Sequence, residues 1–177
     1  MSLLATVAAM LESAGIAFAL IGAGALAAHR VARATGDLDL LTVSPESLSP
    51  VTWRALREQG FEVEIRVAEP GDPLAGVVRI SHGTAPPIDL IVGDRAWQRR
   101  AIERAEPRPL QGARVPIVRA ADLVLLKLYA AGPQDLWDVQ RLLEAAPDRR
   151  ALLAEVESGL ADLGEPVTVA WRRLLEG

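Results

Sequence analysis

Three aspartates lie in or beside apolar segments, where their carboxylates could bind a metal ion. Asp37 and Asp39 are two positions apart at the start of the run DLDLLT, and Asp89 lies in the apolar segment PIDLIV. Residues two apart on a strand project from the same face. Two such charges about 4 Å apart, at an effective dielectric of about 20, repel by roughly 4 kcal/mol. A divalent cation removes this repulsion, and oxygen-only ligation favours Mg²⁺ or Mn²⁺ shared with substrate phosphates. The pattern therefore indicates a metal site for in-line displacement at phosphorus.

A turn of small residues precedes the acidic pair. Gly22 follows the apolar run IAFALI and opens an alanine-rich segment, so the backbone N–H groups beyond it can face a phosphate. Ala23 and Gly24 are small enough to let a polyphosphate approach closely. The same stretch matches the G-x-G-x-x-A pattern of dinucleotide-binding folds, in which an acid follows about 20 residues later at the far end of the second strand. Here Asp37 and Asp39 come 13 and 15 positions after Gly24, at the start of that strand, which favours the phosphate-and-metal interpretation.

The pattern of apolar residues predicts a mixed-sheet α/β (α+β) domain. Helices are predicted over 2–14, 23–31, 44–59, 95–104, 120–131, 134–144, 148–162 and 165–175. Strands are predicted over 16–21, 37–43, 61–67, 76–82, 87–93 and 114–118, with 76–82 and 87–93 forming a hairpin. Ser44 and Pro45 suit the N-cap and first position of the third helix. Pro116 cannot donate to a ladder, which predicts an edge position for strand 114–118.

Composition excludes several kinds of site. The 177 residues include no cysteine, so disulfides, thiolate metal sites and thiol nucleophiles are excluded. The net charge of −4 argues against a broad basic footprint for nucleic acid, and the arginine cluster within 95–114 is interpreted as a solvated helix face. The apolar N-terminal segment contains Glu12 and lacks a basic start, which predicts a core helix and strand instead of a signal peptide or membrane span. A cytoplasmic protein is expected.

The segment LIGAGALAAHRVARATGDLDLLT resembles the signature of the DNA polymerase β-like nucleotidyltransferase superfamily. That signature is an apolar residue, Gly, then Gly or Ser, a spacer, and Asp-apolar-Asp, with a third acid on a later strand. The stretches RATGDLDL and DLVLLKLYAAGPQDLWDV are most similar to the minimal bacterial branch, which includes abortive-infection toxins. The resemblance covers roughly residues 15–145. It implies a nucleotidyltransferase core over 1–118, with a helical part over 119–177 packed on it as one unit.

The resemblance also implies roles for individual residues. Asp37 and Asp39 would bind the metal ions, and Asp89 would complete the site and position or deprotonate the attacking hydroxyl. The residues expected at the nucleotide are Gly22, Ala23, Gly24 and Lys127, with Lys127 reaching the triphosphate. The supporting residues are Arg33, Thr35, Asp135 and Asp138, of which the two aspartates would orient the lysine or order the helix pair. One departure is Ala23, because the family usually has Gly or Ser there and alanine has no hydroxyl to donate to a phosphate.

Structural alternatives remain open for several of these residues. Asp37 could cap a turn after Gly36. Lys127 could extend from an apolar helix face to solvent. Asp135 and Asp138 could be first-turn helix acids favoured by the helix dipole.

The implied reaction is Mg²⁺-dependent transfer of a nucleoside monophosphate from a nucleoside triphosphate such as ATP to a hydroxyl of RNA, protein or a small molecule. The toxin branch implies a toxin–antitoxin role with an antitoxin partner, and no membrane partner is expected. The alternatives are a non-catalytic module that binds a nucleotide or partner, and a structural subunit of another chain.

Overall fold

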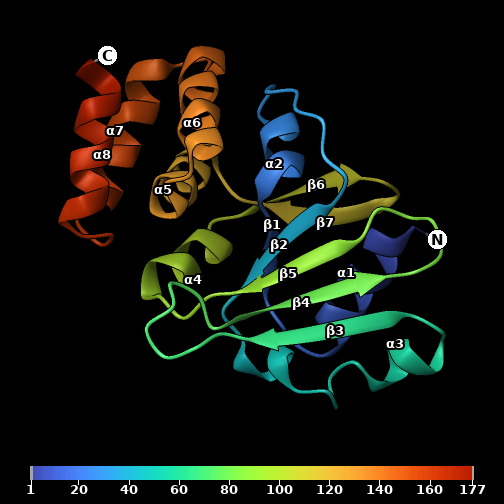
Figure 1. The fold of residues 1–177 in the computed structure, drawn as a ribbon. Helices are drawn as coiled ribbons and strands as arrows, with labels where there is room; N and C mark the ends of the chain where they lie inside the picture. Colours follow the sequence, from blue (N-terminus) through green and yellow to red (C-terminus); the bar gives the residue numbers. More distant parts are fainter. Residues whose placement is uncertain (1, 177) are drawn as a thin grey trace.

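A seven-stranded mixed sheet forms the centre of the molecule (Figure 1). The computed structural model describes residues 2–176. The strands are β1 (Phe18–Leu20), β2 (Leu38–Thr42), β3 (Glu62–Val67), β4 (Gly76–Ser81), β5 (Ile88–Val92), β6 (Glu106–Leu110) and β7 (Ala113–Ile117). Their order across the sheet is β3-β4-β5-β2-β1-β7-β6. The mixed sheet with its helices confirms the predicted fold class.

Helices pack around this sheet and extend it at one end. They are α1 (Leu3–Ser13), α2 (Gly22–Ala28), α3 (Arg54–Glu58), α4 (Ala96–Glu103), α5 (Ala120–Ala130), α6 (Pro133–Ala145), α7 (Arg149–Leu160) and α8 (Glu165–Glu176). The helices α5 to α8 form a separate cluster beside the sheet (Figure 1), and α5 contacts α2 as well as α6, α7 and α8. The division into 1–118 and 119–177 stays a prediction. Within the described residues, no helix is both long and apolar enough to cross a membrane.

Strand directions separate this fold from the dinucleotide-binding alternative. β1 runs antiparallel to β2, whereas β2 runs parallel to β5. A dinucleotide-binding unit needs its first two strands to be parallel and joined by a crossover helix. The predicted hairpin is confirmed, because β4 pairs antiparallel with β5. The reversal between β1 and β2 therefore excludes the dinucleotide arrangement.

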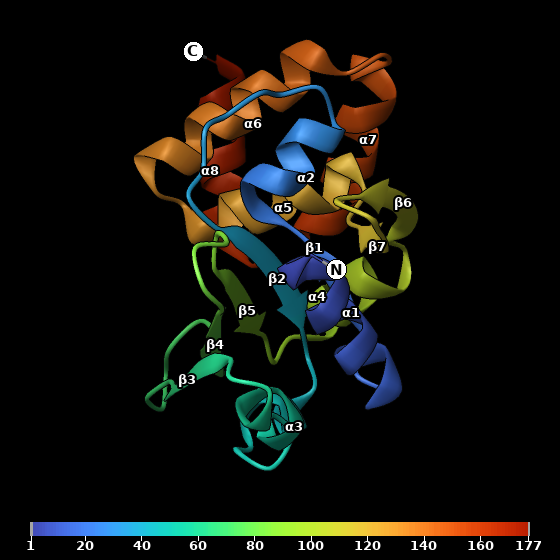
Figure 2. The ribbon, with the colours of Figure 1, turned by 90° about the vertical axis from the view of Figure 1, so that its right-hand side faces the viewer.

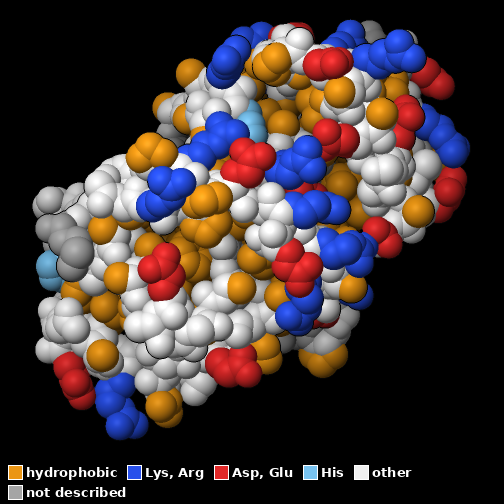
Figure 3. Space-filling view, turned by 180° about the vertical axis from the view of Figure 1, so that it is seen from behind, with side chains coloured by type: hydrophobic (Ala, Val, Ile, Leu, Met, Phe, Trp, Pro, Cys, Tyr) orange, Lys and Arg blue, Asp and Glu red, His pale blue; other side chains and the backbone are white. Residues whose placement is uncertain are grey.

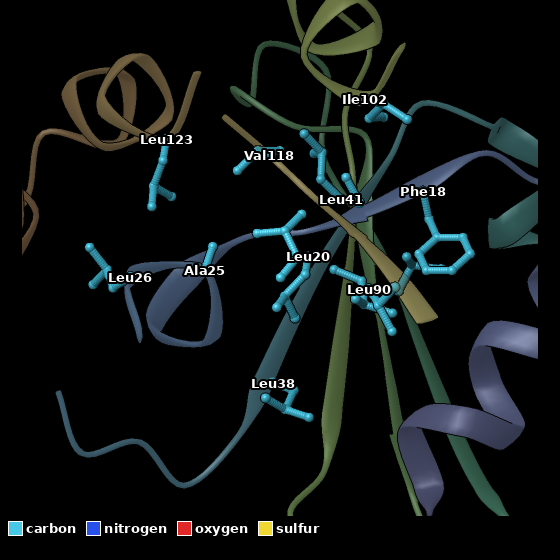
Figure 4. Packing of buried hydrophobic residues seen from close by; sticks show 14 of the residues in the cluster. Phe18, Leu20, Ala25, Leu26, Leu38, Leu41, Leu90, Ile102, Val118 and Leu123 are labelled. Atoms are coloured by element: carbon cyan, nitrogen blue, oxygen red, sulfur yellow. The ribbon is translucent and has the colours of Figure 1, made fainter. Parts of the chain in front are cut away.

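The central strands bury the face opposite their aspartates. Leu40 of β2 and Leu90 of β5 are fully buried neighbours in register, and Leu20 of β1 pairs with Leu40. Figure 4 shows Leu26 of α2 and Leu123 of α5 on the helical side of this cluster. Full burial of a leucine contributes about 1.5–3 kcal/mol. This packing fixes the register of the two strands that carry the acidic residues.

The single helix predicted over 44–59 is wrong. The structure has a 3₁₀ turn over Pro45–Leu48, then turns, then the short α3. Ser49 has extended backbone (φ −83°, ψ 128°), as expected before a proline. Pro50 also lacks the N–H needed to continue a helix. The buried Trp53 fastens the segment by donating its indole N–H to the Ser47 carbonyl at 2.7 Å.

The edge position predicted for strand 114–118 is also wrong. β7 lies between β1 and β6, and the edge is β6, which the sequence analysis missed because its residues EPRPL contain two prolines. Val118 N–H donates to Leu20 O at 3.2 Å, and alternate N–H groups point the same way, so Pro116 faces β1. Pairing of β7 with β1 is accordingly confined to Leu20 and Ile117. The proline shortens one ladder without excluding the strand from the sheet interior.

Candidate active site

Asp39 and Asp89 lie side by side on adjacent strands. β2 and β5 pair in parallel with Asp39 opposite Asp89, so both side chains leave the same face of the sheet. The residues flanking each aspartate point the other way and are buried. Asp37 lies one residue before β2, and its Oδ1 accepts a hydrogen bond from the Thr35 hydroxyl at 2.7 Å. The structure thus brings the two strand aspartates together and places the third beside them on the entering segment.

The electrostatics of this site favour a bound cation. Burial raises the pKa of Asp39, and the nearby Asp37 and Asp89 carboxylates raise it further. Lys127 and Arg33 act in the opposite direction on this pKa. Burial also raises the pKa of Asp89, against the opposing effect of Arg79. Carboxylates that raise one another's pKa are a donor set that a divalent cation would stabilise.

Arg79 is a charged partner of the site that the sequence analysis missed. It lies on β4 opposite Asp89, and its guanidinium binds the Asp89 Oδ2 at 2.9 Å. Within residues 2–176, no three His, Cys, Asp or Glu side chains are grouped as a metal site would require. Arg79 therefore competes with a cation for the Asp89 carboxylate, although a carboxylate has lone pairs enough to bind both. The sequence predicted the hairpin of GVVRISH with PIDLIVG but not its register, and the register is what sets Arg79 opposite Asp89.

Gly22 lies against the Asp39 carboxylate. Its φ is +59°, in the left-handed region that favours glycine, and a Cβ built on it would overlap the Asp39 Oδ2. Gly22 is the first residue of α2, whose N-cap Ile21 makes no side-chain capping bond. Ala23 is buried, and Gly24 packs closely on the Leu20 side chain. The structure shows the contact of Gly22 with Asp39, and the roles of all three small residues at the nucleotide stay predictions.

A buried ion cluster holds Lys127 beside the site. Its Nζ lies 2.8 Å from Asp135 Oδ1 and 2.9 Å from Asp138 Oδ2, and its side chain is only 12% exposed. Arg33 donates to the same Asp138 oxygen at 2.6 Å. Figure 2 shows the segment after α2, which carries Arg33, running alongside α6. This burial does not agree with a lysine that extends freely into solvent.

Asp135 and Asp138 differ in their surroundings. Asp135 also accepts the Gly132 N–H at 3.2 Å, so it caps α6 in addition to binding Lys127. Asp138 is fully buried in the second turn, where the first-turn explanation does not apply, and its Oδ1 has no partner among the described residues. Arg33 and Lys127 both bind Asp138 Oδ2, so this oxygen links the segment before β2 to α5 and α6.

Part of this site lines one cavity of about 320 Å³. Its polar end contains Gly22, Asp39, Lys127 and Asp135. Its other walls are apolar and include Leu41, Ile91, Leu74, Leu123 and Leu126. A second cavity of about 330 Å³ beside Arg108 and Arg119 contains none of the predicted site residues, so volume does not decide between them. The cavity at Asp39 is the candidate site because a carboxylate, a lysine and the backbone of Gly22 converge there.

The arginine cluster is largely paired with acids. Arg100 binds Asp162 at 2.5 Å, and Arg108 binds Glu106 at 3.0 Å. Arg104 is paired with the buried Asp122. Figure 3 shows basic and acidic side chains interspersed on the face seen from behind. The interpretation of a single solvated helix face is wrong in one respect, because Arg108 lies on β6 and Arg114 on β7 while the other arginines lie on or beside α4.

Comparison with known proteins places the chain in a family. A family model described as "Nucleotidyl transferase AbiEii toxin, Type IV TA system" matches residues 3–165. The chain belongs to the AbiEii nucleotidyltransferase toxin family. This confirms the nucleotidyltransferase resemblance and indicates a transferase. Among curated proteins, none matches the chain.

Solved structures share the fold of this AbiEii family member at low sequence identity. A crystal structure of ANT(2")-Ia in complex with adenylyl-2"-tobramycin is 14% identical, with a TM-score of 0.57 over 88% of this chain and 94% of that one. A solution structure of ANT(2'')-Ia is 13% identical, with a TM-score of 0.55 over 86% of each chain. The lincosamide antibiotic adenylyltransferase LnuA, with lincomycin bound, is 12% identical, with a TM-score of 0.50 over 81% of this chain and 96% of that one.

The carboxylates of this AbiEii family member suit a divalent metal ion. Its donors are carboxylate oxygens, which Mg²⁺ and Mn²⁺ prefer. Asp39 and Asp89 are in register, and Asp37 is close enough to raise the pKa of both. The donor set fits such an ion, with Arg79 as a competitor for Asp89.

Proposed function

We propose that the protein transfers a nucleoside monophosphate from a nucleoside triphosphate to an acceptor hydroxyl in a metal-dependent reaction. The observation that carries the proposal is the register of Asp39 with Asp89, together with a cavity that Asp39 lines with Gly22 and Lys127. Membership of a nucleotidyltransferase toxin family supports it.

Each residue has a role that its surroundings support. Asp37 and Asp39 would hold Mg²⁺ or Mn²⁺, which supplies charge neutralisation to the phosphates when bound. Lys127 has two partners and a third N–H donor, which can bind a phosphate oxygen of the triphosphate. Asp89, once released by Arg79, would accept the proton of the attacking hydroxyl. The new bond joins the acceptor oxygen to the α-phosphorus, and the bond to the β-phosphate breaks to release pyrophosphate.

We propose an acceptor hydroxyl and an antitoxin partner on the strength of the family description. A hydroxyl of RNA, of a protein side chain or of a small molecule would serve chemically. The type IV toxin–antitoxin description supports a toxin that is controlled by an antitoxin. A nucleoside triphosphate donor is a cytoplasmic metabolite, so we place the reaction in the cytoplasm.

A second candidate is a non-catalytic module that binds a nucleotide. Two observations favour it. Arg79 forms an ion pair with Asp89, and the buried Ala23 has no hydroxyl to donate to a phosphate. Such a module would bind a triphosphate through Gly22 and Lys127 without transferring anything.

Label transfer distinguishes the two. Each α-labelled nucleoside triphosphate is incubated with the protein, Mg²⁺ and either bulk RNA or a protein mixture. Transfer that disappears in Asp39→Asn and persists in Asp162→Asn, which changes an exposed aspartate paired with Arg100, supports the enzyme. Triphosphate binding without transfer to any acceptor supports the binding module.

A further inference from the structure

Gln98 lies in the wall of the cavity and has a donor group without a partner. It is on α4, is only 4% exposed and lines the same cavity as Asp39. Its Oε1 accepts the backbone N–H groups of Asp94 at 3.1 Å and Arg95 at 3.0 Å. Its Nε2 has no acceptor among the described residues. Capping of α4 explains the carbonyl half of this side chain and leaves the amide nitrogen unexplained.

The orientation of this amide is fixed. Two backbone donors require an acceptor at the Oε1 position, so the amide cannot turn over without placing N–H groups against N–H groups. The head of Gln98 packs on Gly93, where a Cβ would overlap Oε1. Gln98 therefore presents N–H donors only and has no acceptor to offer the cavity.

Gln98 stands at the opposite end of the cavity from the carboxylates. Leu41 and Ile91 lie on the same face as Asp39 and Asp89, two residues further along each strand. Gly93, under Gln98, follows β5 and donates its N–H to Thr42 O at 2.8 Å. At about 3.3 Å per residue, this places Gln98 on the order of 10–13 Å from the aspartates.

A nucleotide whose phosphates lie at Asp39 and Lys127 would extend along this axis. Its base would lie between Leu41 and Ile91 of the sheet and Leu123 and Leu126 of α5. The edge of the base furthest from the sugar would meet the amide. That edge has the exocyclic group at position 4 of a pyrimidine or position 6 of a purine.

We propose that Gln98 selects the nucleobase of the donor nucleotide by donating a hydrogen bond to a carbonyl at this position. UTP and GTP have a carbonyl at this position and would be preferred. CTP and ATP have an amino group there, whose N–H donors would face the N–H donors of Gln98. A site built to hydrogen-bond one group rejects an analogue that leaves it unpaired, so the preference should be roughly tenfold or more. The inference rests on the proposed function in that a triphosphate must bind in this cavity.

Gln98→Glu tests it without removing the cap. A glutamate at this position can accept the same two backbone N–H groups, because Glu and Gln serve equally at the third residue of a helix. Its second oxygen then offers an acceptor in place of a donor. Affinities are measured with Mg²⁺ and non-cleavable analogues of all four triphosphates, and the ratio of affinities between bases is the readout. Gln140→Glu, on the exposed face of α6, is the control for the added charge.

We expect the wild type and Gln140→Glu to favour the UTP and GTP analogues, and Gln98→Glu to favour those of ATP and CTP. An equal loss of affinity for all four analogues, or an unchanged order of bases in Gln98→Glu, would overturn the base-reading role. If the wild type binds none of the analogues, the proposed function fails and this inference fails with it. Thermal melting of each variant shows that the fold is retained.

Discussion

Gly22→Ala tests the contact between α2 and the Asp39 carboxylate. Gly22 has φ +59°, and a methyl group there would overlap the Asp39 Oδ2. Gly15 provides a matched control, because its φ is +68° and nothing lies within 4 Å of the Cβ position. Both substitutions strain the backbone in the same way, and only Gly22→Ala displaces a side chain.

The two effects can be sized separately. A residue with a Cβ in the left-handed region costs about 1–2 kcal/mol. Gly15→Ala should therefore lower the free energy of unfolding by that amount, or the melting temperature by roughly 2–8 °C. Gly22→Ala adds the cost of turning Asp39 out of its rotamer, about 0.5–1.5 kcal/mol. A misplacement of about 1 Å at a reacting centre can lower a rate about 100-fold, so transfer should fall by that order.

Urea denaturation and label transfer measure the two quantities on the same preparations. Gly15→Ala should keep wild-type transfer despite its lower stability, and Gly22→Ala should lose it. In the Asp39→Ala background, Gly22→Ala should cost less stability than in the wild type, because the overlapping oxygens are gone. Wild-type transfer by Gly22→Ala, or equal loss in both glycine variants, would refute the argument that the position of the Asp39 carboxylate against Gly22 matters for transfer.

Three further predictions concern charge. Burial raises the pKa of Asp39 in the folded state, so without metal the free energy of unfolding should fall as pH rises from the unfolded pKa of about 3.9 to the folded pKa. Asp39→Asn should flatten this fall in urea denaturation. An unchanged pH profile would contradict the argument that burial disfavours the charged carboxylate. Asp138→Asn breaks a fully buried ion pair and should lower the free energy of unfolding by about 3–5 kcal/mol. Asp135→Asn should lower it less, because the Asp135 side chain is 22% exposed. Equal losses of the two variants in denaturant would be evidence against the cluster. Arg79→Ala should tighten binding of Mn²⁺ in calorimetric titration, because it removes a positive charge from Asp89. Arg108→Ala, which removes a pair with the exposed Glu106 and is remote from the aspartates, should leave this binding unchanged. Weaker binding by Arg79→Ala would show that the arginine assists the metal.

The central strands could be predicted because their signal is local. The runs around Leu40 and Leu90 are apolar, short and bounded by turn residues, and the structure buries both residues completely. The hairpin of β4 with β5 followed from two such runs and a short link. The segment 44–59 misled because Pro45 suits a helix start while Pro50 ends it five residues later. β6 was missed because its prolines are unfavourable for a strand except at an edge, and only the assembled sheet shows where the edge is.

The candidate site divides in the same way. The spacing of Asp37 and Asp39, the small residues from Gly22 and the acid in PIDLIV are visible in the chain, and they led to the family to which the chain belongs. Residue types and short spacings determine which groups are available and which face of a strand they take.

Tertiary structure decided how those groups are engaged. Pairing between strands set Arg79 on Asp89 and Asp89 beside Asp39. Packing of α6 against α5 brought Asp138 to Lys127, and the start of α4 turned one side of Gln98 toward the cavity. Each of these contacts joins residues of different elements. Their distances depend on the register and packing of the whole sheet, which no local stretch of sequence contains.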